Sequence, residues 1–521
     1  MERAEAEAVY DAGREACVEF LVELSARHER QIARLEARIE RLEDRLRENS
    51  SNSSRPPSAD PPARGPARRR SPSGRKPGGQ PGHGGTTRQL VAEGELDAVI
   101  DHFPLRCSGC GHELAGGEHE SVGDPHRRQV FELPEIAVSI SEHRSHALRC
   151  AGCGSRTRAR LPAEVAASAF GPRLQAALAL LSVRNRISRR DVSELSAELF
   201  GCPVSIGSVD AICQRASGAL AGPYGELREA VKDAPVVCVD ETGWRCAGER
   251  RTLWGALSER AAAFHIAADR HERELPELIG TDFAGIVSSD RWWAYDQLDV
   301  ARRQVCWAHL PRDFRRHSEG LAHQQRFGEA GLEVCRALFA AWDDFHEHAD
   351  RERLAREITP LKRTLRRLLD RAQTKHAKNR QIRTFARNLI KLWPALWTFA
   401  EVDGVEPTNN RAERGLRGAV IYRKISLGSQ SDAGERFAER MLSVSQTCRQ
   451  QRRSLFAYLI DALRAFARGS PTPSLTQAPT RGTERLQNSG LASAWIAPRR
   501  SPVRVRLAPP RGSRAYAGPW S

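Results

Sequence analysis

Long apolar runs are missing from this 521-residue sequence. No stretch of about 18 uncharged apolar residues occurs, which excludes a protein built around membrane-spanning helices. The N-terminus, MERAEAEAVYDAGREACVEF, is acidic and lacks the features of a secretory signal, so we expect an intracellular, reducing compartment. A hydrophobic fraction of 40% is still enough for buried cores, and the length suits about three domains.

An even spread of charge is also lacking. The net charge of +16 is concentrated in residues 55–76, residues 351–391 and the tail from 469 onward. These segments carry +6, +11 and +7, so the rest of the chain carries −8. Separate basic segments of this kind are typical of proteins that hold nucleic acid by its phosphates. Solvated helix faces and unstructured tails are the alternative interpretation.

The N-terminal segment, residues 1–48, has a heptad-like pattern. Its apolar positions, spaced alternately by three and four residues, are Ile32, Leu35, Ile39, Leu42 and Leu46. Alternating Ile and Leu favours a parallel two-stranded coiled coil, and a single amphipathic helix packed on its own domain is the alternative. Residues 49–95 are rich in Asn, Ser, Pro, Gly and Arg and are predicted to form a disordered basic linker.

Four of the twelve cysteines form two CxxC motifs with 39 residues between them. They are Cys107, Cys110, Cys150 and Cys153. This spacing is typical of a structural zinc site, with redox chemistry and unliganded thiols as the alternatives. Residues 129–133 and 136–140 alternate in polarity and are predicted to be strands, so residues 96–162 are expected to form a zinc ribbon.

Residues 163–232 are predicted to be helical. Helices are expected over 174–185, 188–201 and 205–217, with Gly201 in the short turn before the last of them. This arrangement fits a helix-turn-helix that reads DNA, and an ordinary helical spacer fits nearly as well.

Three acids in residues 233–468 mark the predicted chemical site. Asp240 and Asp290 each end a short apolar stretch that is predicted to be a strand, and Glu413 lies near the start of a predicted helix. Residues 251–258 and 262–267 are expected to continue the sheet in antiparallel order. Three carboxylates from two strands and a helix suit a pair of Mg²⁺ ions, although single acids at strand ends are more often turn residues.

The order of motifs resembles one family. NSSNSSRPPS, GGQPGHGG, the two CxxC motifs, VDETGW, SDRWWAYD, CWAHLPRDF and TNNRAERGLRGAVIYRKISLGSQSDAG follow one another as in transposases of the insertion-sequence 66 family. The resemblance covers about residues 20–465. It implies an α+β multidomain protein: a coiled coil, a zinc ribbon, a helical region and an RNase H-like catalytic domain with a helical insertion at about 320–400.

The resemblance also implies roles for individual residues. Asp240, Asp290 and Glu413 become the Mg²⁺ ligands, whereas Glu241 and Asp296 occupy other positions of the same motifs. His309 of the Cys306–His309 CxxH element is expected to have a structural or substrate-positioning role, with metal binding and core packing as alternatives. The expected contacts to DNA phosphates are Arg312, Arg315, Arg316, Arg411, Arg414, Arg417, Arg423 and Lys424.

The implied activity is metal-dependent cleavage of insertion-sequence ends followed by strand transfer into target DNA. The implied partners are DNA, a second subunit in a dimer or higher synaptic assembly, and accessory proteins of the same element, in the bacterial cytoplasm near the nucleoid. A DNA-binding protein without catalysis and a nuclease without strand transfer are the alternatives. Residues 469–521 match no motif and are predicted to be a disordered, dispensable tail.

Overall fold

The computed structural model describes residues 10–47, 90–114, 122–134, 136–320, 322–374, 379–476 and 503–506. The chain divides into two compact units, and each is described by itself. The larger unit includes residues 145–192 and 205–476, and the smaller one includes 70–144, 193–204 and the segment from 477. Residues 96–162 are divided between the two units, and the predicted domain boundaries stay predictions.

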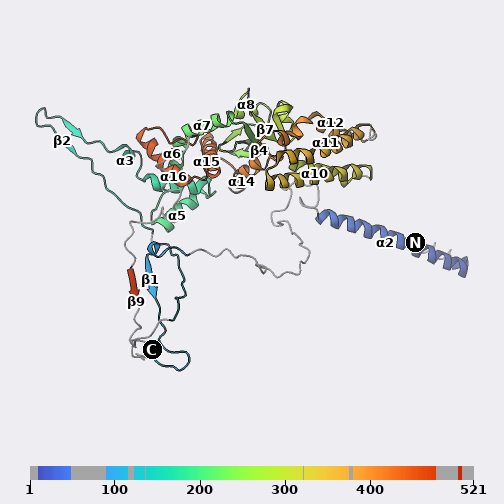
Figure 1. Ribbon diagram of the computed structural model, residues 1–521, viewed down its shortest axis with the longest axis horizontal. Coiled ribbons are helices and arrows are strands. Elements are labelled where there is room, and N and C mark those ends of the chain that lie inside the picture. The colour runs from blue at the N-terminus through green and yellow to red at the C-terminus, as the bar shows by residue number, and fades with distance from the viewer. Residues whose placement is uncertain are drawn as a thin grey trace. The chain divides into compact units, whose positions relative to one another are not determined.

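A five-stranded mixed sheet forms the centre of the larger unit (Figure 1). Its strands are β4 (Val236–Cys246), β5 (Glu249–Leu257), β6 (Ala262–Ala267), β7 (Ile286–Ser289) and β8 (Arg303–Val305). They lie in the order β6-β5-β4-β7-β8, with antiparallel pairs among β4, β5 and β6 and parallel pairs from β4 through β7 to β8. The predicted antiparallel continuation is confirmed.

Helix α14 (Asn410–Ser426) covers one face of this sheet. Its buried residues Ala412, Leu416 and Ala419 pack into one core with Leu253 and Phe264 of the strands. Helix and sheet approach closely at Gly415, where an added Cβ would lie 2.3 Å from Leu257 Cδ2. A glycine here therefore sets the depth at which α14 sits on the sheet.

The open edge of the sheet is closed by side chains of α15 (Asp432–Gln450). The backbone N–H groups of alternate residues on β6 donate to side chains spaced by four on α15. These bonds join Ala262 to Thr447 Oγ1 (3.0 Å), Phe264 to Ser443 Oγ (2.9 Å) and Ile266 to Glu439 Oε1 (2.6 Å). Every second residue of β6 lies beside every fourth residue of α15. The three N–H groups that β6 turns toward α15 are therefore all paired.

A helical bundle follows β8, as predicted for the insertion at about 320–400. It contains α9 (Leu310–Ser318), α10 (Ala322–His348), α11 (Arg351–Thr374), α12 (Arg380–Lys391) and α13 (Thr398–Glu401). Short 3-10 turns lie at Trp293–Tyr295, Val300–Arg302, Trp307–His309 and Pro394–Leu396. Leu365 and Leu369 of the predicted apolar stripe are fully buried in the bundle core, and Leu361 and Leu368 are partly buried.

The remaining helices of the larger unit pack beside the β6 side of the sheet (Figure 1). They are α3 (Ala163–Ala167), α4 (Pro172–Val183), α6 (Ile206–Ala219), α7 (Ala221–Lys232), α8 (Glu274–Ile279) and α16 (Leu455–Arg468), while α5 (Arg189–Phe200) spans both units. The predicted helices are therefore present. The only basic residue of α6, Arg215, donates a hydrogen bond to Gln175 Oε1 (3.0 Å), and DNA reading by this region stays a prediction.

The tail begins later than predicted. Residues 470–476 pack against the helices: Leu475 is 1% exposed, and Pro473 O accepts a hydrogen bond from Tyr458 Oη (2.7 Å). Further along, β9 (Val503–Arg506) pairs in parallel with β1 (Ala98–Asp101) of the smaller unit. The other residues of the predicted tail lie outside the described residues, as does most of the predicted linker.

Both CxxC motifs form the same tight turn. Cys107 N donates to His112 O (2.8 Å), and Cys150 N donates to Ser155 O (2.8 Å). Strands β2 (Ala147–Arg149) and β3 (Arg156–Arg158) form a hairpin around the second turn. The described residues of 129–133 and 136–140 form no strand, so the prediction of strands at these two positions was wrong. The four cysteines belong to different units, and their shared zinc ion stays a prediction.

The N-terminal helix α2 spans Arg14–Arg47 and confirms the helical part of the first prediction. Ile32 and Leu35 of the heptad pattern are 54% and 50% exposed. The side chains of Ile39, Leu42 and Leu46 lie outside the described residues. A short 3-10 turn at Glu93–Glu95 begins the next described segment.

Candidate metal centre

Asp240 was predicted at the end of a strand, but it lies within β4. The strand continues through the polar stretch to Cys246, because its antiparallel ladder with β5 continues there and pairs Asp240 with Gly255. On its other side, β4 pairs in parallel with β7, and Cys238 lies beside Ser288. The same register, two residues further, brings Asp240 level with Asp290.

Asp290 follows the last residue of β7, as predicted. Its Oδ1 accepts the N–H of Trp292 (2.8 Å), and its backbone oxygen accepts a bond from Arg303 Nη2 (2.7 Å). Arg303 is completely buried and also donates to Tyr295 O (2.9 Å). This buried guanidinium fixes the loop that presents Asp290. Its role was missed in the sequence, where it is one arginine among many.

Glu413 lies on the first turn of α14, as predicted. The start of that helix is attached to β4 by Asn409, which is 1% exposed and donates from Nδ2 to Val239 O (2.7 Å), next to Asp240. The backbone N–H of Asn409 bonds to Cys306 Sγ (3.2 Å). Asn409 is therefore a positioning residue that the sequence suggested only as part of a helix start.

The three acids influence one another electrostatically. Burial raises the pKa of Asp240 well above its ordinary value, and the negative charges of Glu241, Asp290 and Glu413 raise it further. Asp240 forms no ion pair among the described residues, and its Oδ1 accepts only the N–H of Glu241 (3.0 Å). A divalent cation would offset this repulsion, and carboxylate oxygens are the ligands that Mg²⁺ prefers.

Glu241 points to the opposite face of β4 and has partners of its own. Its side chain is 1% exposed and accepts hydrogen bonds from Arg270 Nε (2.7 Å) and from the Tyr295 hydroxyl. Burial and the charge of Asp290 raise its pKa, although Arg270 and Tyr295 oppose that rise. The structure thus gives Glu241 a bracing role, in keeping with its position outside the predicted triad.

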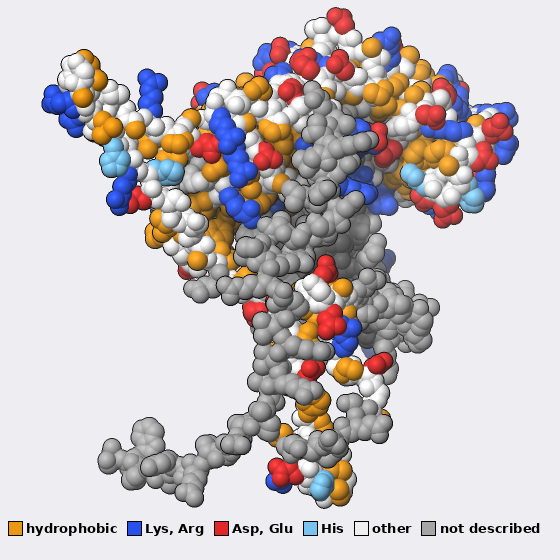
Figure 2. Space-filling model, turned by 60° about the vertical axis from the view of Figure 1, so that its left-hand side comes forward, with side chains coloured by type: hydrophobic (Ala, Val, Ile, Leu, Met, Phe, Trp, Pro, Cys, Tyr) orange, Lys and Arg blue, Asp and Glu red, His pale blue; other side chains and the backbone are white. Residues whose placement is uncertain are grey.

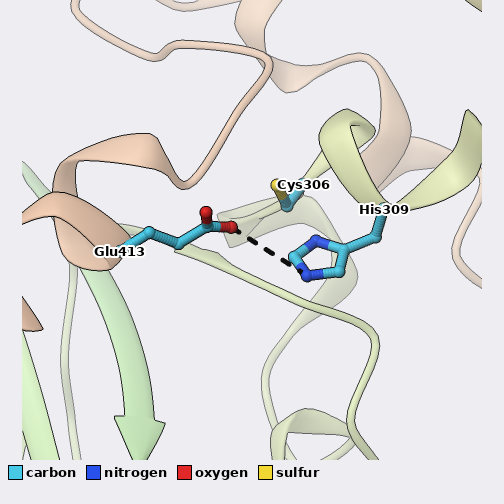
Figure 3. A group of neighbouring side chains, drawn as sticks. All are labelled: Cys306, His309 and Glu413. Atoms are coloured by element: carbon cyan, nitrogen blue, oxygen red, sulfur yellow. Dashed lines mark ion pairs between the residues drawn. The ribbon is translucent and has the colours of Figure 1, made fainter. Parts of the chain in front are cut away.

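His309 and Cys306 lie beside Glu413 (Figure 3). His309 Nε2 is 3.9 Å from Glu413 Oε1, while its buried Nδ1 has no hydrogen-bond partner. Burial and the charge of Arg312 lower the pKa of His309, which favours the neutral ring. Burial raises the pKa of Cys306 to about 12, so this thiol keeps its proton. Ligand atoms of Cys306, His309 and Glu413 lie within 4.8 Å of one another, so the group has the donor set and spacing of a possible metal site.

A second group of possible ligands lies at the far end of β4. Cys246, Asp432 and Glu435 have ligand atoms within 4.8 Å of one another. Burial and the charge of Glu435 raise the pKa of Cys246, so the thiol is held as a donor beside a carboxylate.

The predicted phosphate-binding residues occupy different environments. Arg414, Arg417 and Lys424 are exposed on α14, and Arg316 is exposed on α9. Arg312 and Arg315 are half-buried, Arg411 pairs with Glu406 (3.5 Å), and Arg423 donates to Gly243 O. Figure 2 shows blue and red side chains interspersed over the face in view, so basic side chains do not gather into one broad surface there.

Comparison with known proteins identifies the family to which the chain belongs. The family described as Transposase IS66 family matches residues 167–436, and a family of unknown function (DUF6444) matches residues 2–89. The chain is also 22% identical over 407 residues to the uncharacterized protein y4hP of Sinorhizobium fredii, covering 72% of each chain. Among the described residues no helix has the length and apolar character needed to cross a bilayer. All three acids lie inside the matched range, and the chain belongs to the IS66 family of transposases.

Proposed function

We propose that this transposase cuts and joins DNA at a two-metal centre formed by Asp240, Asp290 and Glu413. The proposal is carried by the parallel pairing of β4 with β7: continued by two residues, this register brings Asp240 level with Asp290, and α14, which packs against β4, carries Glu413. The strand order supports an RNase H-like fold for the domain: three antiparallel strands followed by two parallel ones, with acids on the first and fourth. DNA is the partner that this chemistry implies.

Two Mg²⁺ ions held here would activate the attacking oxygen and stabilise the leaving oxygen of an in-line displacement. The chain's own residues keep the ligands in place. Asn409 fixes the start of α14 relative to β4, and Arg303 fixes the loop of Asp290. His309, with its pKa lowered, adds no positive charge next to Glu413 at neutral pH and can hold a hydrogen bond through either ring nitrogen.

Two reactions would follow at the same centre. In the first, water attacks the phosphorus at the element's end, the bond from phosphorus to the 3′ oxygen breaks, and the strand keeps a free 3′-hydroxyl. In the second, that hydroxyl loses its proton and attacks a target phosphodiester, and a target 3′ oxygen leaves. Neither reaction needs a covalent bond to the protein, so positioning and charge stabilisation are the protein's contribution.

The test is cleavage of a duplex carrying the terminal inverted repeat of the element, with and without Mg²⁺. We expect Asp240→Asn, Asp290→Asn and Glu413→Gln each to abolish cleavage while binding persists. Asp282→Asn is the matched control, because Asp282 is an exposed acid shortly before β7 that forms no ion pair among the described residues. Undiminished cleavage in the triad variants would reject the assignment.

A pre-cleaved duplex with a free 3′-hydroxyl tests the second reaction. Joined product supports a transposase that completes strand transfer, whereas cleavage without joining supports a nuclease. Wild-type binding without any cutting in Mg²⁺ or Mn²⁺ would support a DNA-binding protein that lacks catalysis.

Assembly and zinc binding belong to the same proposal. Val18, Leu21, Ile32 and Leu35 of α2 are each at least half exposed, which supports pairing with a second copy. Hydrogen bonds within each CxxC turn lower the pKa of Cys107 and of Cys153, which favours the thiolates that zinc needs. Sedimentation of a chain without residues 1–48 and zinc analysis of a Cys107→Ser variant test these two points.

A further inference from the structure

A hollow of ≈ 680 Å³ lies where β4, β5, the segment after β6 and the end of α14 meet. Six of its lining side chains are cationic and one is acidic. The cations, which define what we call the basic hollow, are Arg245, Arg250, Arg251, Arg270, Arg423 and Lys424. None of these residues is one of the three acids, and only Arg270, through its bond to Glu241, contacts a residue next to one of them.

Several cations of the basic hollow have no carboxylate partner. Arg270 bonds to Glu241, and Arg251 pairs with Glu249 (3.0 Å). Arg245 donates only to the backbone oxygen of Gly248 (2.8 Å), and Arg423 donates only to that of Gly243. Asp269, the acid of the lining, pairs with Arg273 outside it.

Two more cations have no side-chain partner at all. Within the described part of the chain, neither Arg250 nor Lys424 has a side-chain hydrogen bond or ion pair, and both are exposed. The hollow therefore keeps an uncompensated positive charge.

The register of β4 and β5 brings two of these cations together. Arg245 lies directly opposite Arg250 in the antiparallel ladder of β4 and β5. Like charges at directly opposed positions destabilise a hairpin. The turn between them fixes the register, with Ala247 and Gly248 both at positive φ (48° and 88°). An anion bound between the two guanidinium groups would remove the repulsion.

The lining favours a phosphate over a base. Trp244 is the one aromatic residue of the lining and is 2% exposed, so no ring face is open for stacking. The available groups are guanidinium and ammonium donors, which bind phosphate oxygens without reading sequence. A duplex supplies such oxygens at a regular spacing.

The distance along β4 indicates which phosphates reach the hollow. Arg245 is five residues from Asp240 on one strand, which is about 17 Å at about 3.3 Å per residue. A duplex advances about 3.4 Å per nucleotide on each strand. The two sites are thus separated by about five nucleotides.

We propose that the basic hollow binds a backbone phosphate of the DNA duplex about five nucleotides from the bond that is cut. The distance from the cut rests on the proposed function. The phosphate contact is inferred from the hollow alone. It adds Arg245 and Arg250 to the DNA contacts expected from the sequence.

The test is equilibrium binding in EDTA, by fluorescence anisotropy over a range of salt concentrations. Arg250→Gln with Lys424→Gln is the test variant, and Arg260→Gln with Arg326→Gln is the control, because both control residues are exposed and lie outside the hollow. On a duplex extending ten base pairs to either side of the cut, we expect the log–log salt slope of the test variant to fall by about 0.9, the value for one lost phosphate contact.

A second duplex locates the contact. On a duplex that ends three base pairs from the cut on both sides, the test variant and the wild type should bind with the same slope. The unfolding midpoint of the test variant should equal or exceed that of the wild type, because a like-charged pair has been removed. The proposal would be overturned if the test variant had the same salt slope as the control variant on the long duplex. It would also be overturned if the test variant lost as much salt slope on the short duplex as on the long one.

Two further outcomes separate this inference from the proposed function. If the test variant loses salt slope but the wild type never cuts with Mg²⁺, the hollow binds DNA and the proposed chemistry fails. If the wild type cuts while the test variant binds like the control, the inference alone fails. Thermal stabilisation by inorganic phosphate without any change in the DNA slope would assign the hollow to a small anion and overturn the DNA assignment.

Discussion

Replacing Asn409 by alanine should damage the metal centre without touching a metal ligand. The Asn409 amide is 1% exposed and donates to Val239 O at 2.7 Å, and only an NH₂ group can donate to that carbonyl. Alanine leaves a buried carbonyl without its partner, which costs about 1–3 kcal/mol. The loss also frees the start of α14, so Glu413 is no longer held beside Asp240.

Two assays separate the structural effect from the positioning effect. Urea unfolding should show the loss of about 1–3 kcal/mol in the free energy of unfolding. Cleavage at a temperature where the variant is folded should need more Mg²⁺ for half-maximal rate, and a shift of about 1 Å in a ligand can cost about 10²-fold in rate.

Asn410→Ala is the matched control for this experiment. Asn410 is the next residue of the same motif, is half-buried, and makes no side-chain hydrogen bond among the described residues. Its replacement should change stability by less than about 0.5 kcal/mol and leave the Mg²⁺ dependence unaltered. If the two variants behaved alike in both assays, the positioning role of Asn409 would be wrong.

Three other predictions follow from the described contacts. Because the folded pKa of Asp240 lies above its unfolded value, stability in EDTA should decline as pH rises from the unfolded pKa toward the folded pKa, and Asp240→Asn should remove this decline in urea unfolding. Gly415→Ala should cost about 1–3 kcal/mol through contact with Leu257, and a Leu257→Ala partner change should restore part of the thermal midpoint. Ending the chain after Arg468 should lower the thermal midpoint by exposing the buried contacts of residues 470–476, whereas ending it after Thr476 should not.

Local patterns predicted most of the elements that carry the site. The short apolar stretches before Asp240 and Asp290 do form neighbouring strands, and Glu413 does lie on the first turn of a helix. These features depend on residues a few positions apart, which a single sequence displays. The helical insertion was predicted for the same reason, because leucines at helical spacing recur in it.

Features that depend on distant residues were missed. The polar residues after Asp240 gave no strand signal, yet β4 continues to Cys246 because β5 supplies its ladder and α14 covers it. The alternation in residues 129–133 suggested a strand that lacks any pairing partner in the described structure. Arg303 became a buried brace only through contacts with Ser289 and Tyr295.

The length of β4 connects the two sites of the catalytic domain. Asp240 faces α14 and the metal centre, whereas Gly243 and Arg245 have the opposite parity and line the basic hollow. A paired strand is stiff, so the distance from the acid to the guanidinium is fixed by five residues of ladder and not by a loop. Inserting one residue between Asp240 and Arg245 would turn the side chain of Arg245 to the other face. The phosphate contact at Arg245 and the proposed metal centre at Asp240 therefore depend on the same register of β4, so one strand positions both.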